Sequence, residues 1–184
     1  GAGVIPGGGG TKEFALRMSD ATFEGDIELP SLRNSFLTIG MAKVSTSGAE
    51  AFDLGYYVKG RDRIVLNQNR QIAEAKQEVI NLSNAGYTRP TERKDIRVLG
   101  REGLGIVYAG ANTMFSGKYI SAHDKLISEK LGYVLCGGDL SAKTLVSEQY
   151  LLNLEREAFL SLCGQKKTLE RIQSLLTPGK PLRN

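Results

Sequence analysis

The stretch IPGGGGTKEFALRM, residues 5–18, decides the fold, because four consecutive glycines lead directly into a helical pattern. Phe14, Ala15 and Met18 repeat at helical spacing, and Thr11 is the predicted N-cap. Backbone amides at such a helix N-terminus can hold a water molecule, an oxyanion or a phosphate. The same glycines also suit a tight turn with close backbone packing, and the residues alone favour this second interpretation.

Two phosphate-binding motifs resemble this stretch, but each lacks a residue that it needs. GAGVIP begins like the dinucleotide fingerprint GxGxxG, but Pro6 stands where a glycine or alanine lets helix and strand pack closely. GGGGTKE has Thr11 before Lys12, which reverses the order of the P-loop residues that meet phosphate and magnesium. Nucleotide binding by the loop alone is therefore the weakest of the three hypotheses considered for this chain.

The rest of the chain is dominated by helical patterns. Short strands are predicted at 56–59 and 63–66. Residues 87–118 form the least regular region, with room for one short helix or two. No internal repeat is present. Amphipathic or capped helices are predicted over residues 31–45, 48–54, 69–84, 121–135, 147–163 and 168–178.

Composition excludes several classes of function. Hydrophobic residues make up 41% of the 184 residues, and the net charge of +4 is scattered without a basic stripe, so no nucleic-acid partner is expected. No apolar run is long enough to span a membrane, and no signal sequence is visible, which favours a cytoplasmic protein. Two cysteines, Cys136 and Cys163, are too few for a disulfide framework in a chain of this length, which favours a reducing compartment. The lone His123 and the distant cysteines have no zinc spacing, so no metal is expected.

Several segments resemble the crotonase (enoyl-CoA hydratase/isomerase) family. Residues 5–17 are similar to its I-P-G-x-G-G-T segment, and residues 48–59 and 62–83 to the stretch and helix that follow. Residues 123–140 and 147–184 resemble the C-terminal end of long bacterial β-oxidation proteins. In such proteins an NAD-dependent 3-hydroxyacyl-CoA dehydrogenase part comes first and a crotonase part last.

The resemblance implies a mainly α fold with a few short β-strands: the second half of a crotonase-like (ClpP/crotonase) α/β spiral domain with its C-terminal helical tail. Residues 1–86 would be the remainder of the crotonase core and residues 87–184 the helical region. In the family the spiral, the oxyanion-hole segments and both catalytic glutamates precede the glycine loop. We therefore expect Gly1 to mark a cut and the fragment alone to be inactive.

The resemblance also implies a role in fatty-acid β-oxidation, with hydratase (lyase) and oxidoreductase chemistry in the parent protein. NAD belongs to the parent's dehydrogenase part, and the fragment itself is expected to hold no cofactor. The expected partners are an acyl-CoA substrate and the parent's upstream dehydrogenase and crotonase segments. Because half a domain leaves apolar surface uncovered, self-association is also expected.

Site residues follow from the resemblance position by position. Gly7 corresponds to the glycine whose backbone amide helps to place the catalytic water, and Gly8 and Gly9 continue the loop toward acyl-CoA. Lys180 resembles the basic residue that meets the CoA phosphate, with a solvated tail lysine as the alternative. Glu13 is interpreted as a first-turn charge at the helix dipole. Gly137 and Gly138 are interpreted as a helix C-cap rather than an oxyanion motif.

A different class of function is also compatible with the sequence. The apolar stripes on residues 147–163 and 168–176 could serve a non-catalytic helical module for oligomerisation or interaction, without any ligand. Binding distinguishes the two hypotheses, since only the enzymatic one requires the loop and the tail to recognise CoA.

Overall fold

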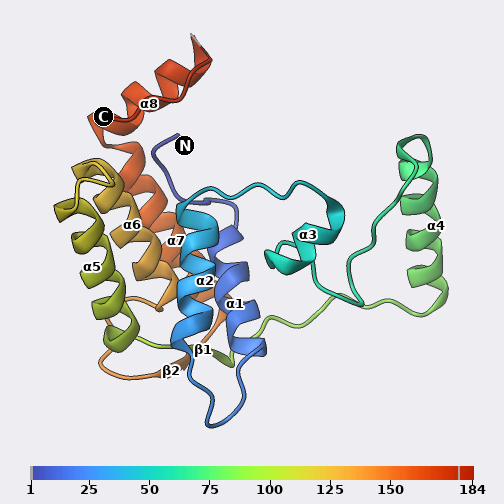
Figure 1. Ribbon diagram of the computed structural model, residues 1–184. Helices are drawn as coiled ribbons and strands as arrows, with labels where there is room; N and C mark the ends of the chain where they lie inside the picture. Colours follow the sequence, from blue (N-terminus) through green and yellow to red (C-terminus); the bar gives the residue numbers. More distant parts are fainter. Residues whose placement is uncertain (1, 178) are drawn as a thin grey trace. The chain divides into compact units, whose positions relative to one another are not determined.

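The computed structural model describes residues 2–177 and 179–184 and divides into two compact units (Figure 1). One unit joins residues 1–43 to residues 93–184, and the other comprises residues 44–92. The expected boundary between residues 86 and 87 therefore differs from the observed division. The physical reason is that α1 packs against elements that follow residue 93.

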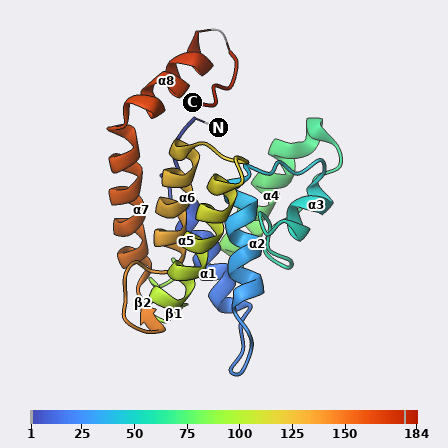
Figure 2. The same cartoon turned by 60° about the vertical axis from the view of Figure 1, so that its left-hand side comes forward.

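The larger unit is a helical assembly around a short two-stranded sheet. Helix α1 contacts α2, α6, α7 and strand β1, and α5, α6 and α7 lie side by side in sequence order (Figure 2). Its elements are α1 (Gly10–Asp20), α2 (Leu29–Gly40), β1 (Ile96–Val98), α5 (Arg101–Ser116), α6 (Ala122–Leu135), β2 (Thr144–Val146), α7 (Glu148–Cys163) and α8 (Lys166–Leu176).

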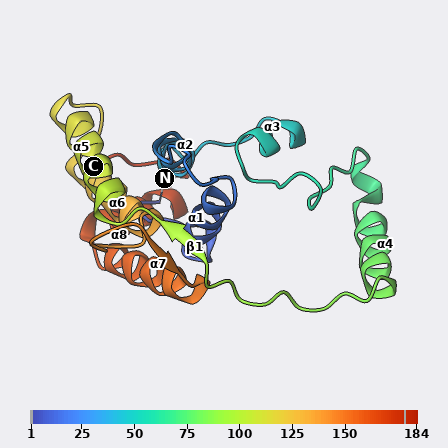
Figure 3. The ribbon, with the colours of Figure 1, turned by 90° about the horizontal axis from the view of Figure 1, so that it is seen from below.

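The core of this unit is formed mainly by side chains from α1, α2, β1, α6 and α7. Figure 3 shows the backbone of these elements from below. Leucines from α2, α6 and α7 are almost fully buried there, together with Ile96 and Val98 of β1. Helices α5 and α6 approach closely because Gly132 faces the side chain of Val107, where a Cβ atom would clash. Burial of this apolar surface is the main stabilising contribution to the unit.

The smaller unit contains α3 (Gly48–Asp53), the 3-10 helix η1 (Gln68–Arg70) and α4 (Gln71–Asn84). The prediction of strands at 56–59 and 63–66 is wrong. The amides of Tyr56 and Tyr57 instead both donate to the Ala51 carbonyl, which closes the end of α3. The observed strands β1 and β2 pair antiparallel, with Ile96 opposite Val146. Each has three residues, too few for a clear alternating pattern.

Local signals predicted several helix boundaries correctly. Ser121 and Ser147 are the N-caps of α6 and α7, and Ser121 forms a capping box with Asp124. Gly137 and Gly138 have φ angles of 76° and 81° after α6, so the C-cap interpretation is confirmed.

Other boundaries were predicted wrongly. Gly9 is the N-cap of α1, while Thr11 lies buried inside the helix. Thr168 likewise lies inside α8, which begins at Lys166. Helix α2 ends at Gly40. Residues 87–118, where one or two short helices were expected, contain the 16-residue helix α5. The predicted closure of the last helix at Pro178 falls outside the described residues.

The described chain is thus mostly helical with two short strands, whereas the crotonase-like spiral stays a prediction. Among the described residues, none of the helices is both long and apolar enough to cross a bilayer.

Candidate functional site

The glycine loop sits at the N-terminus of α1 and is fixed there by backbone geometry. Gly9, the N-cap, has φ 96° and ψ 2°, a left-handed conformation that favours glycine. Gly9 is buried, while Gly7 and Gly8 are exposed. The three predicted loop residues therefore lie in two different environments, and only Gly7 and Gly8 face solvent.

A buried carboxylate from α7 occupies the N-terminus of α1. Glu155 is 1% exposed, and its two oxygens accept hydrogen bonds from the amides of Gly9 (2.5 Å) and Lys12 (3.0 Å). Helix N-termini attract anions because their first amides lack helical partners and the helix dipole is positive there. Glu155 already takes the position that a bound anion would occupy, so the Gly9 amide is structural.

Close packing accounts for two further glycines of the loop. A Cβ atom at Gly7 would lie 2.6 Å from the ring of Phe159 on α7, and one at Gly10 would lie 2.9 Å from Pro6. Nothing lies within 4 Å of the corresponding position at Gly8. Packing therefore requires glycine at positions 7 and 10, whereas Gly8 has open space around it.

Next to the loop, an ion-pair cluster links α1 to α7. Lys12 Nζ lies 2.8 Å from Glu13 and 2.9 Å from Glu148, and Glu148 also accepts a hydrogen bond from the Arg93 amide. Burial alone would lower the pKa of Lys12, but the bonds to the two carboxylates outweigh it and raise the pKa. Glu13 is thus an ion-pair partner in the first turn of α1.

Lys180 lies in the tail that follows α8 and is exposed. Its amide donates to the Ser174 carbonyl (3.3 Å), and its own carbonyl accepts from the Ser174 hydroxyl (2.8 Å). Within residues 2–177 and 179–184, no hydrogen bond or ion pair connects it to the glycine loop. The structure therefore does not join the predicted loop residues and the predicted CoA-phosphate residue into one site.

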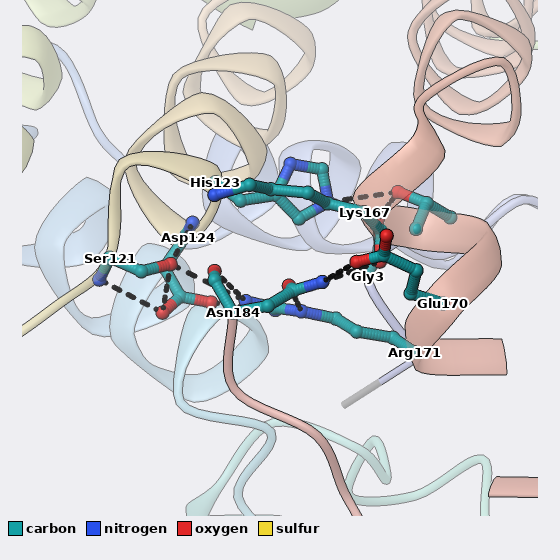
Figure 4. A network of polar contacts seen from close by, with 9 residues as sticks. Gly3, Ser121, His123, Asp124, Lys167, Glu170, Arg171 and Asn184 are labelled. Carbon is teal, nitrogen blue, oxygen red and sulfur yellow. Dashed lines mark hydrogen bonds and ion pairs between the residues drawn. The ribbon is translucent and has the colours of Figure 1, made fainter. Parts of the chain in front are cut away.

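Sequence reasoning missed a second buried polar network, which Figure 4 shows. His123 Nε2 lies 2.9 Å from the hydroxyl of Thr168, and that hydroxyl donates to the Gly3 carbonyl at 2.8 Å. Since the hydroxyl has a single proton, His123 Nε2 carries the hydrogen and donates to it. Burial, followed by the nearby Arg171 and Lys167, lowers the pKa of His123 and favours the neutral ring.

Arg171, which is 3% exposed, is the centre of the other half of this network. Its guanidinium donates to Asp124 (2.7 Å) on α6 and to the side-chain oxygen of Asn184 (2.9 Å) in the tail. Burial would raise the pKa of Asp124, but hydrogen bonds from Arg171 and Ser121 outweigh it and lower the pKa. The Ser121–Asp124 capping box was a sequence signal for one part of this network, but nothing marked Arg171.

The thiol of Cys136 lacks the features of a nucleophile. Cys136 is completely buried, and burial raises the pKa of its thiol to about 12, so it stays protonated. Among the described residues, no group of three or more histidine, cysteine, aspartate or glutamate side chains could hold a metal ion.

Comparisons with known proteins relate the whole chain to part of a larger one. The chain matches no protein-family model, and no solved structure shows a significant match. Over all 184 residues it is 42% identical to a protein of Bacillus subtilis (strain 168) named probable 3-hydroxyacyl-CoA dehydrogenase. The chain spans 23% of that relative's length.

Proposed function

We propose that this chain is a segment of a fatty-acid β-oxidation enzyme with 3-hydroxyacyl-CoA dehydrogenase and enoyl-CoA hydratase activities. The observation that carries the proposal is the 42% identity to the Bacillus subtilis relative along the entire chain. The IPGGGGT segment adds support for the hydratase part. NAD would bind in the dehydrogenase part of the larger protein, since the chain itself lacks a complete dinucleotide fingerprint.

The contacts of the loop narrow its proposed role. Because the Gly9 amide already donates to Glu155, Gly9 supports the loop, and the Gly7 amide is the one that places the water molecule. The exposed Gly8 faces the acyl-CoA, and Lys180 meets the CoA phosphate. Hydration of an enoyl thioester needs a base, an acid and amides that stabilise the developing oxyanion. One such amide typically contributes about 3–4 kcal/mol.

The carboxylates beside the loop are poor candidates for the acid and the base. Glu13 and Glu148 are held by Lys12, and Glu155 is held by the two amides at the start of α1. The proposal therefore places both catalytic carboxylates in other segments of the larger protein. The 184-residue chain alone is then inactive.

A non-catalytic helical interaction module is the second candidate. Two observations favour it: the anion position at α1 is filled by Glu155, and Gly7 is explained by its contact with Phe159. In this alternative the loop serves only to pack α1 against α7, and the segment contributes only helices and subunit contacts.

Segment replacement in the Bacillus subtilis relative tests the proposal. One variant lacks the matched segment, and a second carries this 184-residue chain in its place. NAD reduction with a 3-hydroxyacyl-CoA and the loss of enoyl-thioester absorbance from crotonyl-CoA report the two activities. We expect crotonyl-CoA hydration to disappear with the deletion and to return with the replacement.

Three outcomes would contradict parts of this proposal. Hydration that survives the deletion would remove the hydratase role and support the interaction module, above all if the oligomeric state changes. Loss of NAD reduction alone would indicate that the segment serves the dehydrogenase activity. Hydration by the isolated 184-residue chain would mean that it contains the catalytic carboxylates, and the assignment of both to other segments would be wrong.

A further inference from the structure

A groove lies between the α5–α6 turn and the tail that follows α8. Its volume is about 640 Å³, within the usual range for small-molecule sites of about 300–1,000 Å³. Phe115, Tyr119 and Ile120 give it an apolar side, and Tyr119 is 79% exposed. Exposed aromatic side chains in a concave surface provide stacking and apolar contact for a ligand.

The turn that carries these side chains has a defined conformation. After α5, the amides of Gly117, Lys118 and Tyr119 donate to the carbonyls of Thr113, Phe115 and Met114, respectively. Lys118 has a φ angle of 60°, in the left-handed region that few non-glycine residues adopt. The backbone of the groove is therefore fixed by hydrogen bonds on this side.

The groove carries two cations without anionic partners. Lys118 and Arg183 both line it, and within the described parts of the chain neither side chain forms an ion pair or a hydrogen bond. The carboxylate that lines the groove, Asp124, is engaged by Arg171 at 2.7 Å and by Ser121 at 3.0 Å. The free charge at the groove is therefore positive, which favours an anionic ligand.

The network of Figure 4 holds the tail beside the groove. Asn184 accepts hydrogen bonds from Arg171 and donates to Glu170 (2.7 Å) and to the Lys167 carbonyl (3.3 Å). Arg183 precedes this anchored residue directly. Fixing a residue before the ligand arrives lowers the entropic cost of binding.

We propose that this groove binds a small amphipathic anion, with its charged group at Lys118 and Arg183 and its apolar body against Phe115, Tyr119 and Ile120. The site goes beyond the proposed function and does not depend on it. The charged group, or head, can be a carboxylate or a phosphate, and the apolar body can be an alkyl chain or an aromatic ring. The residues that line the groove offer the same contacts to each of them.

Titrations of the 184-residue chain followed by ¹H–¹⁵N NMR test this site. Octanoate and phenyl phosphate combine a head with a body, acetate and inorganic phosphate lack the body, and benzyl alcohol lacks the charge. We expect at least one amphipathic probe to shift the signals of residues 118–120 and 183, with affinity at least about tenfold above that of every partial probe. The better of the two probes distinguishes a chain-bearing carboxylate from a ring-bearing phosphate.

Variants connect the binding to the named residues. Lys118→Asn removes the cation and keeps a side chain that tolerates the left-handed backbone, and Arg183→Gln removes the second cation. Each should weaken binding about tenfold, and Asn184→Ala should weaken it through the released tail. Lys94→Gln removes one charge from an exposed position that does not line the groove and serves as the control. The proposal is overturned if no probe shifts these signals, if benzyl alcohol binds as well, or if Lys94→Gln weakens binding equally.

Discussion

Replacing Glu155 by Gln tests the central contact of the glycine loop. The substitution keeps the side-chain volume, and the amide oxygen can still accept from one of the two backbone groups, Gly9 or Lys12. The other donor then faces the side-chain NH2. One hydrogen bond to a charged acceptor is lost, which costs about 1.5–3 kcal/mol. Loss of the negative charge at the helix N-terminus adds about 0.3–1 kcal/mol.

The expected destabilisation is therefore about 2–4 kcal/mol, which lowers the melting temperature by about 5–15 °C for a chain of this size. Urea unfolding followed by circular dichroism measures the free energy of unfolding. Hydrogen exchange of the Gly9 amide measures the contact itself, with the exposed Gly8 as an internal reference. Glu157→Gln is the matched control, since Glu157 is exposed on the same helix and should change stability by less than about 0.5 kcal/mol.

Two results would refute this reasoning about the loop. Equal stability of the Glu155→Gln and Glu157→Gln proteins would show that the buried carboxylate contributes no more than a surface charge. Exchange of the Gly9 amide as fast as that of Gly8 would show that the hydrogen bond does not persist in solution. The N-terminus of α1 would then be open to an external anion.

Further predictions concern the loop packing and the buried histidine. Gly7→Ala brings a Cβ atom to 2.6 Å from the Phe159 ring and should lower the free energy of unfolding by about 1–3 kcal/mol. Gly8→Ala enters open space and should lower it by less than about 0.5 kcal/mol. Equal urea midpoints for the two variants would contradict the packing argument. The pKa of His123 is lowered from its ordinary 6.5, chiefly by burial, so the unfolded chain takes up a proton more readily and stability falls as the pH drops below about 6.5. His123→Gln should flatten this dependence between about pH 7.5 and pH 5.5, and an unchanged slope would count against a neutral buried ring.

Local sequence signals were sufficient for part of the fold. Ser121 and Ser147 cap the N-termini of α6 and α7, and Gly137 and Gly138 end α6. These signals are reliable because each residue acts on backbone groups only a few residues away. Signals of this kind failed where tertiary contacts compete. Thr168 has the character of an N-cap, but its hydroxyl is used by His123 and Gly3 inside the fold.

The candidate site shows the same division. The sequence by itself placed a glycine loop at the start of a helix and thus determined that several amides would gather there. Only the tertiary structure decided what those amides bind, because Glu155 lies 146 residues from Gly9 along the chain. The tertiary structure likewise decided that Arg171 is buried and that β1 pairs with β2. Contacts between residues so distant in the sequence form only when the whole unit packs, and they leave no periodic pattern in the sequence.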